Sequence, residues 1–411
     1  MKLCRLYLLL PSLFLLLLAL GIGDFEEFLP GFLVILKHPG ILITDYFAIA
    51  GIPATLFNVA LVGCIGWGLL FCTYTITGNH VAALLTLMGF AFFGKNPLNI
   101  LPVLLGCFLF ACVARKPFGE ILPASLFATS LAPVVGLLFC HWNFRFELAL
   151  ISGILGGFLT LAIASKVVSF HSGYNLYNVG FSGGIVGSLL AALFEGFGFT
   201  VKPLLSWKEH APPEIPLVLS VALASLLIFG FLVDRQVLSR WKYLLSLSGK
   251  PPSDFLSYSP SATLWNMGIT GLLGVIYVLL VRGSFNGPVL GGIFTMVGFA
   301  AFGKHPKNVF PILAGVYLGT LCSSFEAHDP GPLLAALFSS ALAPLAGEFG
   351  ILAGVLAGFL HLFMVMNVGI LHGGLNLYNN GFAAGFVAVV VASVFSWKDT
   401  LSESLKKRLT D

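Results

Sequence analysis

The sequence predicts an all-α integral membrane protein with two inverted-topology repeats of about six apolar segments each, some of them re-entrant half-helices. Three observations lead to this prediction. The 411 residues are 58% hydrophobic and only 9% charged, whereas soluble domains carry roughly 25% charged residues. Apolar segments approach the length of about 20 residues that a bilayer span needs. Four sequence blocks also occur twice, in the same order.

Residues 1–46 are predicted to hold a first membrane helix and a loop. Lys2 and Arg5 precede an apolar run that reaches Gly23. A signal peptide has a similar charge pattern, but no small-residue cleavage site follows this run. A membrane helix is therefore the favoured interpretation.

The duplicated blocks define repeat 1 at residues 47–198 and repeat 2 at residues 255–396. Residues 199–254 form a linker with one membrane helix, and residues 397–411 form a cytoplasmic tail. The paired blocks are ATLFN (54–58) and ATLWN (262–266), GFAFFGKNPLNILPVLLG (89–106) and GFAAFGKHPKNVFPILAG (298–315), LFATSLAP (126–133) and LFSSALAP (337–344), and HSGYNLYNVGF (171–181) and HGGLNLYNNGF (372–382). Such self-similarity indicates an internal duplication.

Each repeat holds six apolar segments. In repeat 1 they lie near residues 54–76, 79–93, 98–113, 120–139, 147–168 and 179–198. Several have only about 15 residues, which is short for a full span, so half-helices buried in protein are expected among them. The whole chain then has about 12 to 14 spans.

Loop charges predict the orientation of the repeats. Positively charged residues favour the cytoplasmic side. They precede the N-terminal helix, follow the linker helix and occur in the tail: Lys2, Arg5, Arg235, Arg240, Lys242, Lys250, Lys398, Lys406, Lys407 and Arg408. Both termini are thus expected in the cytoplasm of a bacterial inner membrane. Repeat 1 then starts and ends outside, whereas repeat 2 starts and ends inside.

One pair of equivalent loops supports the inversion. The loop after the third segment is ARKPFGE in repeat 1, with Arg115 and Lys116, and FEAHDPG in repeat 2, with Glu326 and Asp329. Opposite charges are expected if these loops lie on opposite sides of the membrane.

Polar residues that recur in both copies are the candidates for a substrate pathway. Polar groups are costly in hydrocarbon and face the bundle interior or a cavity. The candidates are Asn175, Tyr177, Asn178, Asn376, Tyr378, Asn379, Asn58, Asn266, Thr86, Thr295, His171 and His372. The two asparagines of each NLYN phrase are three residues apart and are expected to share a helix face.

Structural interpretations stand beside this one. Asparagines in a bundle also join neighbouring helices by hydrogen bonds, without any role in transport. His171 and His372 fit a loop or interfacial position. Lys95 and Lys304 lie in short GK(N/H)P turns and are expected to reach the lipid headgroups.

Several function classes lack support. No metal-ligand spacing, catalytic motif or cofactor-binding motif occurs, so neither an enzyme nor a metal or cofactor is expected. The basic residues are dispersed, which argues against nucleic-acid binding. No acidic residue recurs within the membrane segments, which weakens proton coupling. The expected partners are a small-molecule solute and the lipid bilayer, and the architecture is compatible with a homo-oligomer.

The GK(N/H)P and HxGxNLYNxGF motifs resemble those of an uncharacterised bacterial family of tandem-repeat polytopic membrane proteins. More distantly, SGYNLYNVGFSGG (172–184), FNGPVLGG (285–292) and LPASLFATSLAP (122–133) are similar to phrases of urea transporters. That resemblance implies two inverted repeats around a narrow pore lined by aromatic, threonine and amide side chains. The order of the phrases differs from the urea-transporter order, and the acidic residue of those pores has no repeated match.

The sequence therefore predicts a channel or facilitator for a small neutral or weakly charged solute. Two alternatives remain at this point. One is an ion-coupled secondary transporter, since Na⁺ can bind to carbonyl and hydroxyl oxygens alone. The other is a membrane scaffold that transports nothing.

Overall fold

A computed structural model describes residues 2–23 and 25–410, and within them the chain is all helical apart from loops and isolated bridges. The side chains of residues 2–4, 25, 27 and 398–410, which include Lys2 and the basic residues of the tail, lie outside the described ones. The all-α prediction is confirmed for the part of the chain that the structure describes.

The helices form two halves with the same order of elements. The first half contains α1 (Lys2–Ile22), α2 (Phe25–Lys37), α3 (Tyr46–Ala50), α4 (Ile52–Leu69), α5 (Gly78–Phe90), α6 (Pro97–Ala114), α7 (Phe118–Ala128), α8 (Ala132–Gly136), α9 (Phe146–Phe170) and α10 (Asn178–Gly196). The second contains α11 (Glu214–Val233), α12 (Val237–Leu244), α13 (Phe255–Tyr258), α14 (Pro260–Leu280), α15 (Gly287–Phe299), α16 (Pro306–Leu321), α17 (Pro330–Ser339), α18 (Ala343–Phe349), α19 (Ile351–Val368) and α20 (Asn379–Thr410). α1 packs on α4 as α11 packs on α14, so the helix before each repeat follows the duplication too.

Eleven helical stretches of the described chain are long and apolar enough to cross a membrane. This number is below the expected 12 to 14 spans because α16 has only 16 residues, and α5 and α15 have only 13 each. α5 and α15 are each about 20 Å long, too short to cross the hydrocarbon. The predicted half-helices are therefore these two elements.

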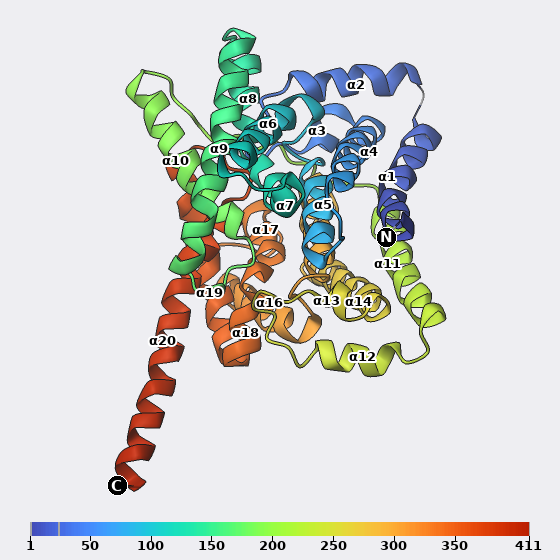
Figure 1. Ribbon diagram of the computed structural model, residues 1–411. Coiled ribbons are helices and arrows are strands. Elements are labelled where there is room, and N and C mark those ends of the chain that lie inside the picture. Colours follow the sequence, from blue (N-terminus) through green and yellow to red (C-terminus); the bar gives the residue numbers. More distant parts are fainter. Residues whose placement is uncertain (1, 24, 411) are drawn as a thin grey trace.

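The two half-helices pack against each other in opposite directions. Gly89, near the end of α5, meets Gly291, near the start of α15, and Gly298 likewise meets Ala82. A twofold relation between the halves produces this arrangement, so equivalent helices run in opposite senses. In Figure 1, α5 lies near the centre, with α2 along one edge and α12 along the opposite edge.

Two carboxylates join the halves at the starts of the half-helices. Asp45 accepts from the N–H of Phe47 at the start of α3 (3.0 Å) and from the N–H of Gly287 at the start of α15 (3.2 Å). Its counterpart Asp254 stands before α13 and accepts from the N–H of Gly78 at the start of α5 (2.8 Å). Since the first N–H groups of a helix lack partners within it, each half caps the half-helix of the other.

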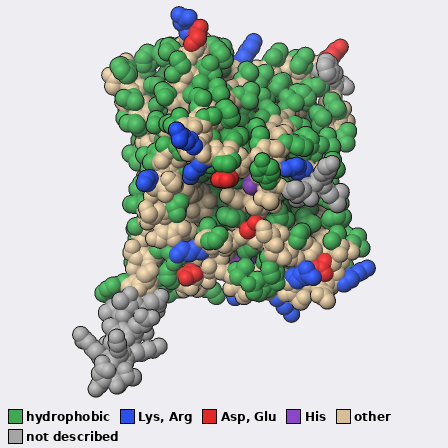
Figure 2. Space-filling model, in the orientation of Figure 1, with side chains coloured by type: hydrophobic (Ala, Val, Ile, Leu, Met, Phe, Trp, Pro, Cys, Tyr) green, Lys and Arg blue, Asp and Glu red, His purple; other side chains and the backbone are tan. Residues whose placement is uncertain are grey.

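The outer surface fits a lipid environment. Figure 2 shows hydrophobic side chains over much of the visible face, with charged side chains at its upper and lower edges and across its middle. α11 is an example, because its Leu217, Ile228 and Leu232 are all more than 60% exposed. The protein is thus a polytopic membrane protein whose helices contact the bilayer.

Candidate substrate pathway at the centre

The chain breaks between α5 and α6, and again between α15 and α16, inside the protein. Gly94 (φ +100°) and Gly303 (φ +96°) take backbone conformations in these breaks that other residues rarely adopt. Asn58 donates from Nδ2 to the carbonyls of Ala91 (2.7 Å) and Lys95 (2.9 Å). Asn266 donates to the carbonyls of Ala300 and Lys304 in the same way. The predicted pair Asn58 and Asn266 therefore stabilises the two breaks.

Each break carries a buried lysine that contacts a tyrosine of the other half. The Nζ of Lys95 lies 2.7 Å from the hydroxyl oxygen of Tyr378 and 4.5 Å from the centroid of its ring. Lys304 donates to the hydroxyl of Tyr177 and, at 2.7 Å, to Oγ of Ser340. Its Nζ lies 4.4 Å from the Tyr177 ring centroid.

The expectation that Lys95 and Lys304 reach the headgroups is wrong. Both residues are 0% exposed, because the break turns each side chain inward toward the other half. Among the described residues, no acidic side chain forms an ion pair with either lysine. The sequence signal was their recurrence in both copies, but a local turn does not tell which way its side chain points.

The NLYN phrases form turns ahead of α10 and α20. Asn175 accepts from the N–H of Tyr177 (2.9 Å) and donates to the carbonyl of Gly381 in the other half (2.9 Å). Asn376 repeats this pattern with Tyr378 (3.2 Å) and Gly180 (3.1 Å). The prediction that the two asparagines of a phrase share a helix face is wrong, because each helix begins at the second asparagine.

The histidines and the second asparagines connect neighbouring helices. His171 Nε2 lies 2.9 Å from Oδ1 of Asn178, whose Nδ2 donates to the carbonyl of Ala164 in α9 (2.9 Å). His372 and Asn379 make the equivalent contact at 3.0 Å. Both histidines are buried, at 1% and 0% exposure, so they do not lie in water-facing loops.

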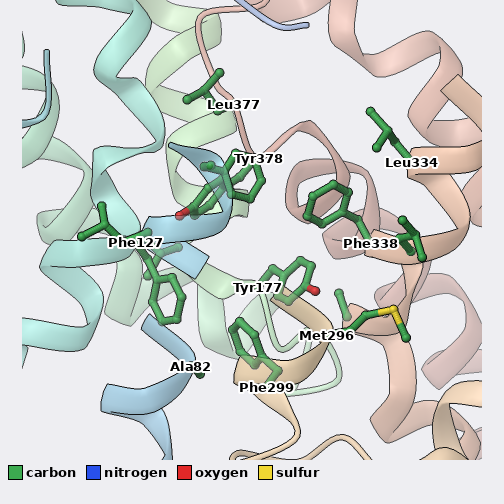
Figure 3. Packing of buried hydrophobic residues seen from close by; sticks show 14 of the residues in the cluster. Ala82, Phe127, Tyr177, Met296, Phe299, Leu334, Phe338, Leu377 and Tyr378 are labelled. Atoms are coloured by element: carbon green, nitrogen blue, oxygen red, sulfur yellow. The ribbon is translucent and has the colours of Figure 1, made fainter. Parts of the chain in front are cut away.

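A cavity of about 300 Å³ lies between the halves and is lined mainly by apolar atoms. Seven predicted residues line it: Thr86, Thr295, His171, Asn175, Tyr177, Asn178 and Tyr378. Five predicted residues are not in the lining: Asn58, Asn266, His372, Asn376 and Asn379. Figure 3 shows Tyr177 and Tyr378 among Phe127, Phe299 and Phe338, with the two hydroxyl groups pointing in opposite directions.

The cavity does not follow the twofold symmetry. It reaches Asn79 and the exposed Pro251 in the loop after α12, whereas Pro288, the counterpart of Asn79, is buried and outside the lining. The hydrogen bonds of the two histidines also break the symmetry. Among the described groups, Nδ1 of His171 has no partner, while Nδ1 of His372 accepts from the N–H of Gly374 (3.2 Å). The cavity is thus open toward the α12 end and closed toward the α2 end.

One protein-family model, described as a protein of unknown function (DUF1576), matches the chain twice, at residues 25–196 and 233–397. The two matches begin at α2 and just before α12, and so follow the two structural halves. No curated protein and no solved structure is similar to the chain. Nothing in these comparisons links it to urea transporters.

Proposed function

Since the chain belongs to the DUF1576 family, whose function is unknown, we propose from the geometry of its centre that it is a facilitator of solute transport. The observation that carries this proposal is the cavity of about 300 Å³ between the oppositely directed halves, lined by residues of both. Sites of this kind, at the interface of inverted repeats and beside broken helices, are typical of secondary transporters. The solute is small and neutral or weakly charged.

The one-sided opening supports a carrier over a continuous channel. Asn79 and Pro251 lie at the open end, and the counterpart of Asn79 at the α2 end is buried. Exchanging the conformations of the two halves would close the first end and open the second. The opposed repeats thus supply both states of an alternating-access cycle.

The proposal also includes the orientation and the absence of an enzymatic step. The α12 end faces the cytoplasm of a bacterial inner membrane, because Arg235, Arg240 and Lys242 lie around α12. The polar groups of the lining are amides, hydroxyls and an imidazole, which are suited to binding a solute. The cavity lies within one chain, so a second copy is not needed for transport.

A matched cysteine pair tests the cycle. In a variant without the seven cysteines, Asn79→Cys and Pro288→Cys place thiols at equivalent positions of the two ends. A membrane-impermeant thiol reagent should modify residue 79 from the α12 side. It should modify residue 288 only from the opposite side, and more slowly. Equal modification of both positions from one side would contradict alternating access.

The flux itself is measured by stopped-flow light scattering on proteoliposomes. Urea, formamide, glycerol and ammonium acetate are the test solutes. Relaxation should be fast for at least one of them and slower after modification of Asn79→Cys, with the unmodified protein as the control. Flux that requires a Na⁺ or H⁺ gradient would favour the ion-coupled transporter. No flux with folded protein would favour the scaffold.

A further inference from the structure

The centre holds two buried lysines without acidic partners. Lys95 and Lys304 are both fully buried, and their contacts are neutral hydroxyl groups and aromatic rings. Burying a charge without a counter-charge is costly, and hydroxyl groups and ring faces offset only part of that cost. A negatively charged ligand close to the two lysines would offset the rest of that cost.

We propose that the cavity binds a small organic anion, a carboxylate with a compact apolar body, whose charge is balanced by Lys95 and Lys304. This inference rests on the proposed transport function and assigns a substrate class to it. It narrows the solute from neutral or weakly charged to a weak organic acid in its anionic form.

Two tyrosine hydroxyl groups connect the lysines to the cavity, since Tyr177 and Tyr378 both line it and each accepts from a lysine. Tyr378 lines the cavity and accepts from Lys95, and no described residue accepts from its own O–H. A hydrogen bond from an ammonium group makes that O–H a stronger donor. Thr86 also lines the cavity, and its Oγ1 is buried without a partner, whereas Oγ1 of its counterpart Thr295 donates to Gly291 (2.8 Å). Free O–H donors are what a carboxylate oxygen binds.

The rest of the lining determines the size and polarity of the ligand beyond its carboxylate. Phe90, Phe127, Phe299 and Phe338 contribute aromatic rings to a mainly apolar wall. The volume of about 300 Å³ is at the lower end of small-molecule sites. A compact apolar body therefore fits beside these rings, with its carboxylate directed to the hydroxyl groups.

The test compares carboxylates with amides of the same shape. Benzoate with benzamide, and propionate with propionamide, are titrated against the purified full-length protein, and the thermal unfolding midpoint gives the apparent affinity. In the wild type at least one carboxylate should bind about tenfold or more tightly than its amide. Equal binding within both pairs would overturn the proposal.

Variants that remove the charge of one lysine test whether the two lysines cause the preference for the carboxylate. Lys95→Met and Lys304→Met should each bring the preference for the carboxylate close to one. Lys202→Met is the control, because Lys202 is exposed in the loop after α10 and lies outside the cavity lining. Folded methionine variants that keep the preference would overturn the proposal.

A second set of variants applies if the methionine variants do not fold. Thr86→Val and Tyr378→Phe remove the donor groups with little change of shape, and each should weaken the binding of the carboxylate more than that of the amide. Equal weakening of both would contradict the proposal. Carboxylate binding without any flux would overturn the transport function and leave the anion site. Flux of an amide but not of its carboxylate would overturn the anion site and leave the transport function.

Discussion

Asn58 and Asn266 each satisfy two backbone carbonyls where a helix stops inside the membrane. No water is available there, so an unpaired carbonyl is costly. An amide is suited to this task because its NH₂ group has two donors. The asparagine thereby fixes the turn that carries the lysine.

We expect Asn58→Leu and Asn266→Leu to destabilise the protein, by about 1–3 kcal/mol for each carbonyl left without a donor. Asn266→Leu should cost more, since Oδ1 of Asn266 also accepts from Nε1 of Trp241 (3.1 Å), while Oδ1 of Asn58 has no described partner. Thermal unfolding of the purified variants measures the difference. Unchanged midpoints, or a larger loss for Asn58→Leu, would contradict this role.

The sequence identified many central residues but not their roles. Recurrence in both copies singled out Asn58, the NLYN phrases and Thr86, because a duplicated centre repeats its polar groups. The lysine contacts could not be predicted, since Lys95 and Tyr378 are 283 residues apart in the chain. Nothing local distinguishes a lysine that reaches the headgroups from one that turns inward.

The helices were predictable where the length and hydropathy of a segment determine whether it is helical. The short segments of repeat 1 and repeat 2 predicted half-helices, and α5 and α15 have 13 residues each. The NLYN phrases were placed incorrectly because asparagine competes with helix formation by binding its own backbone. Asn175 does so, since it accepts from the N–H of Tyr177 two residues later.

The contact between α5 and α15 leads to a prediction about its glycines. A Cβ on Gly89 would lie 2.7 Å from the carbonyl oxygen of Gly291, whereas on Gly298 its nearest neighbour, Cβ of Leu85, is 3.0 Å away. Gly89→Ala should therefore cost about 1–3 kcal/mol, and Gly298→Ala less. Gly68→Ala in α4 is the control, because no atom lies within 4 Å of that Cβ, and alanine there should be neutral or stabilising. Thermal unfolding midpoints in the reverse order would sink this account of the packing.

The opposed direction of the halves was predictable from charge alone. Basic and acidic residues of the loops stay at the surface, where they follow the difference between the two sides of the membrane. The twofold packing itself was not predictable, since Gly89 and Gly291, like Gly180 and Gly381, meet across the chain without any local signal.

Cysteine labelling tests the orientation of the whole molecule. Lys116 is exposed between α6 and α7, and Asp329 is half-exposed between α16 and α17. In a cysteine-free variant, Lys116→Cys and Asp329→Cys should react with an impermeant thiol reagent from opposite faces of the membrane. The residue-116 thiol should react from the cytoplasmic side. Reaction of both from the same face would falsify the inverted arrangement.

The exchange of contacts between the halves has a consequence for how the protein is made. Lys95 leaves the ribosome long before Tyr378, and Gly78 before Asp254. When the first half enters the bilayer, its lysine and the first N–H groups of its half-helix therefore lack their hydrogen-bond partners. These partners are present only after the second half has been inserted. Biogenesis thus ends with a docking step, in which two incomplete, oppositely inserted modules give each other the partners that neither can make alone.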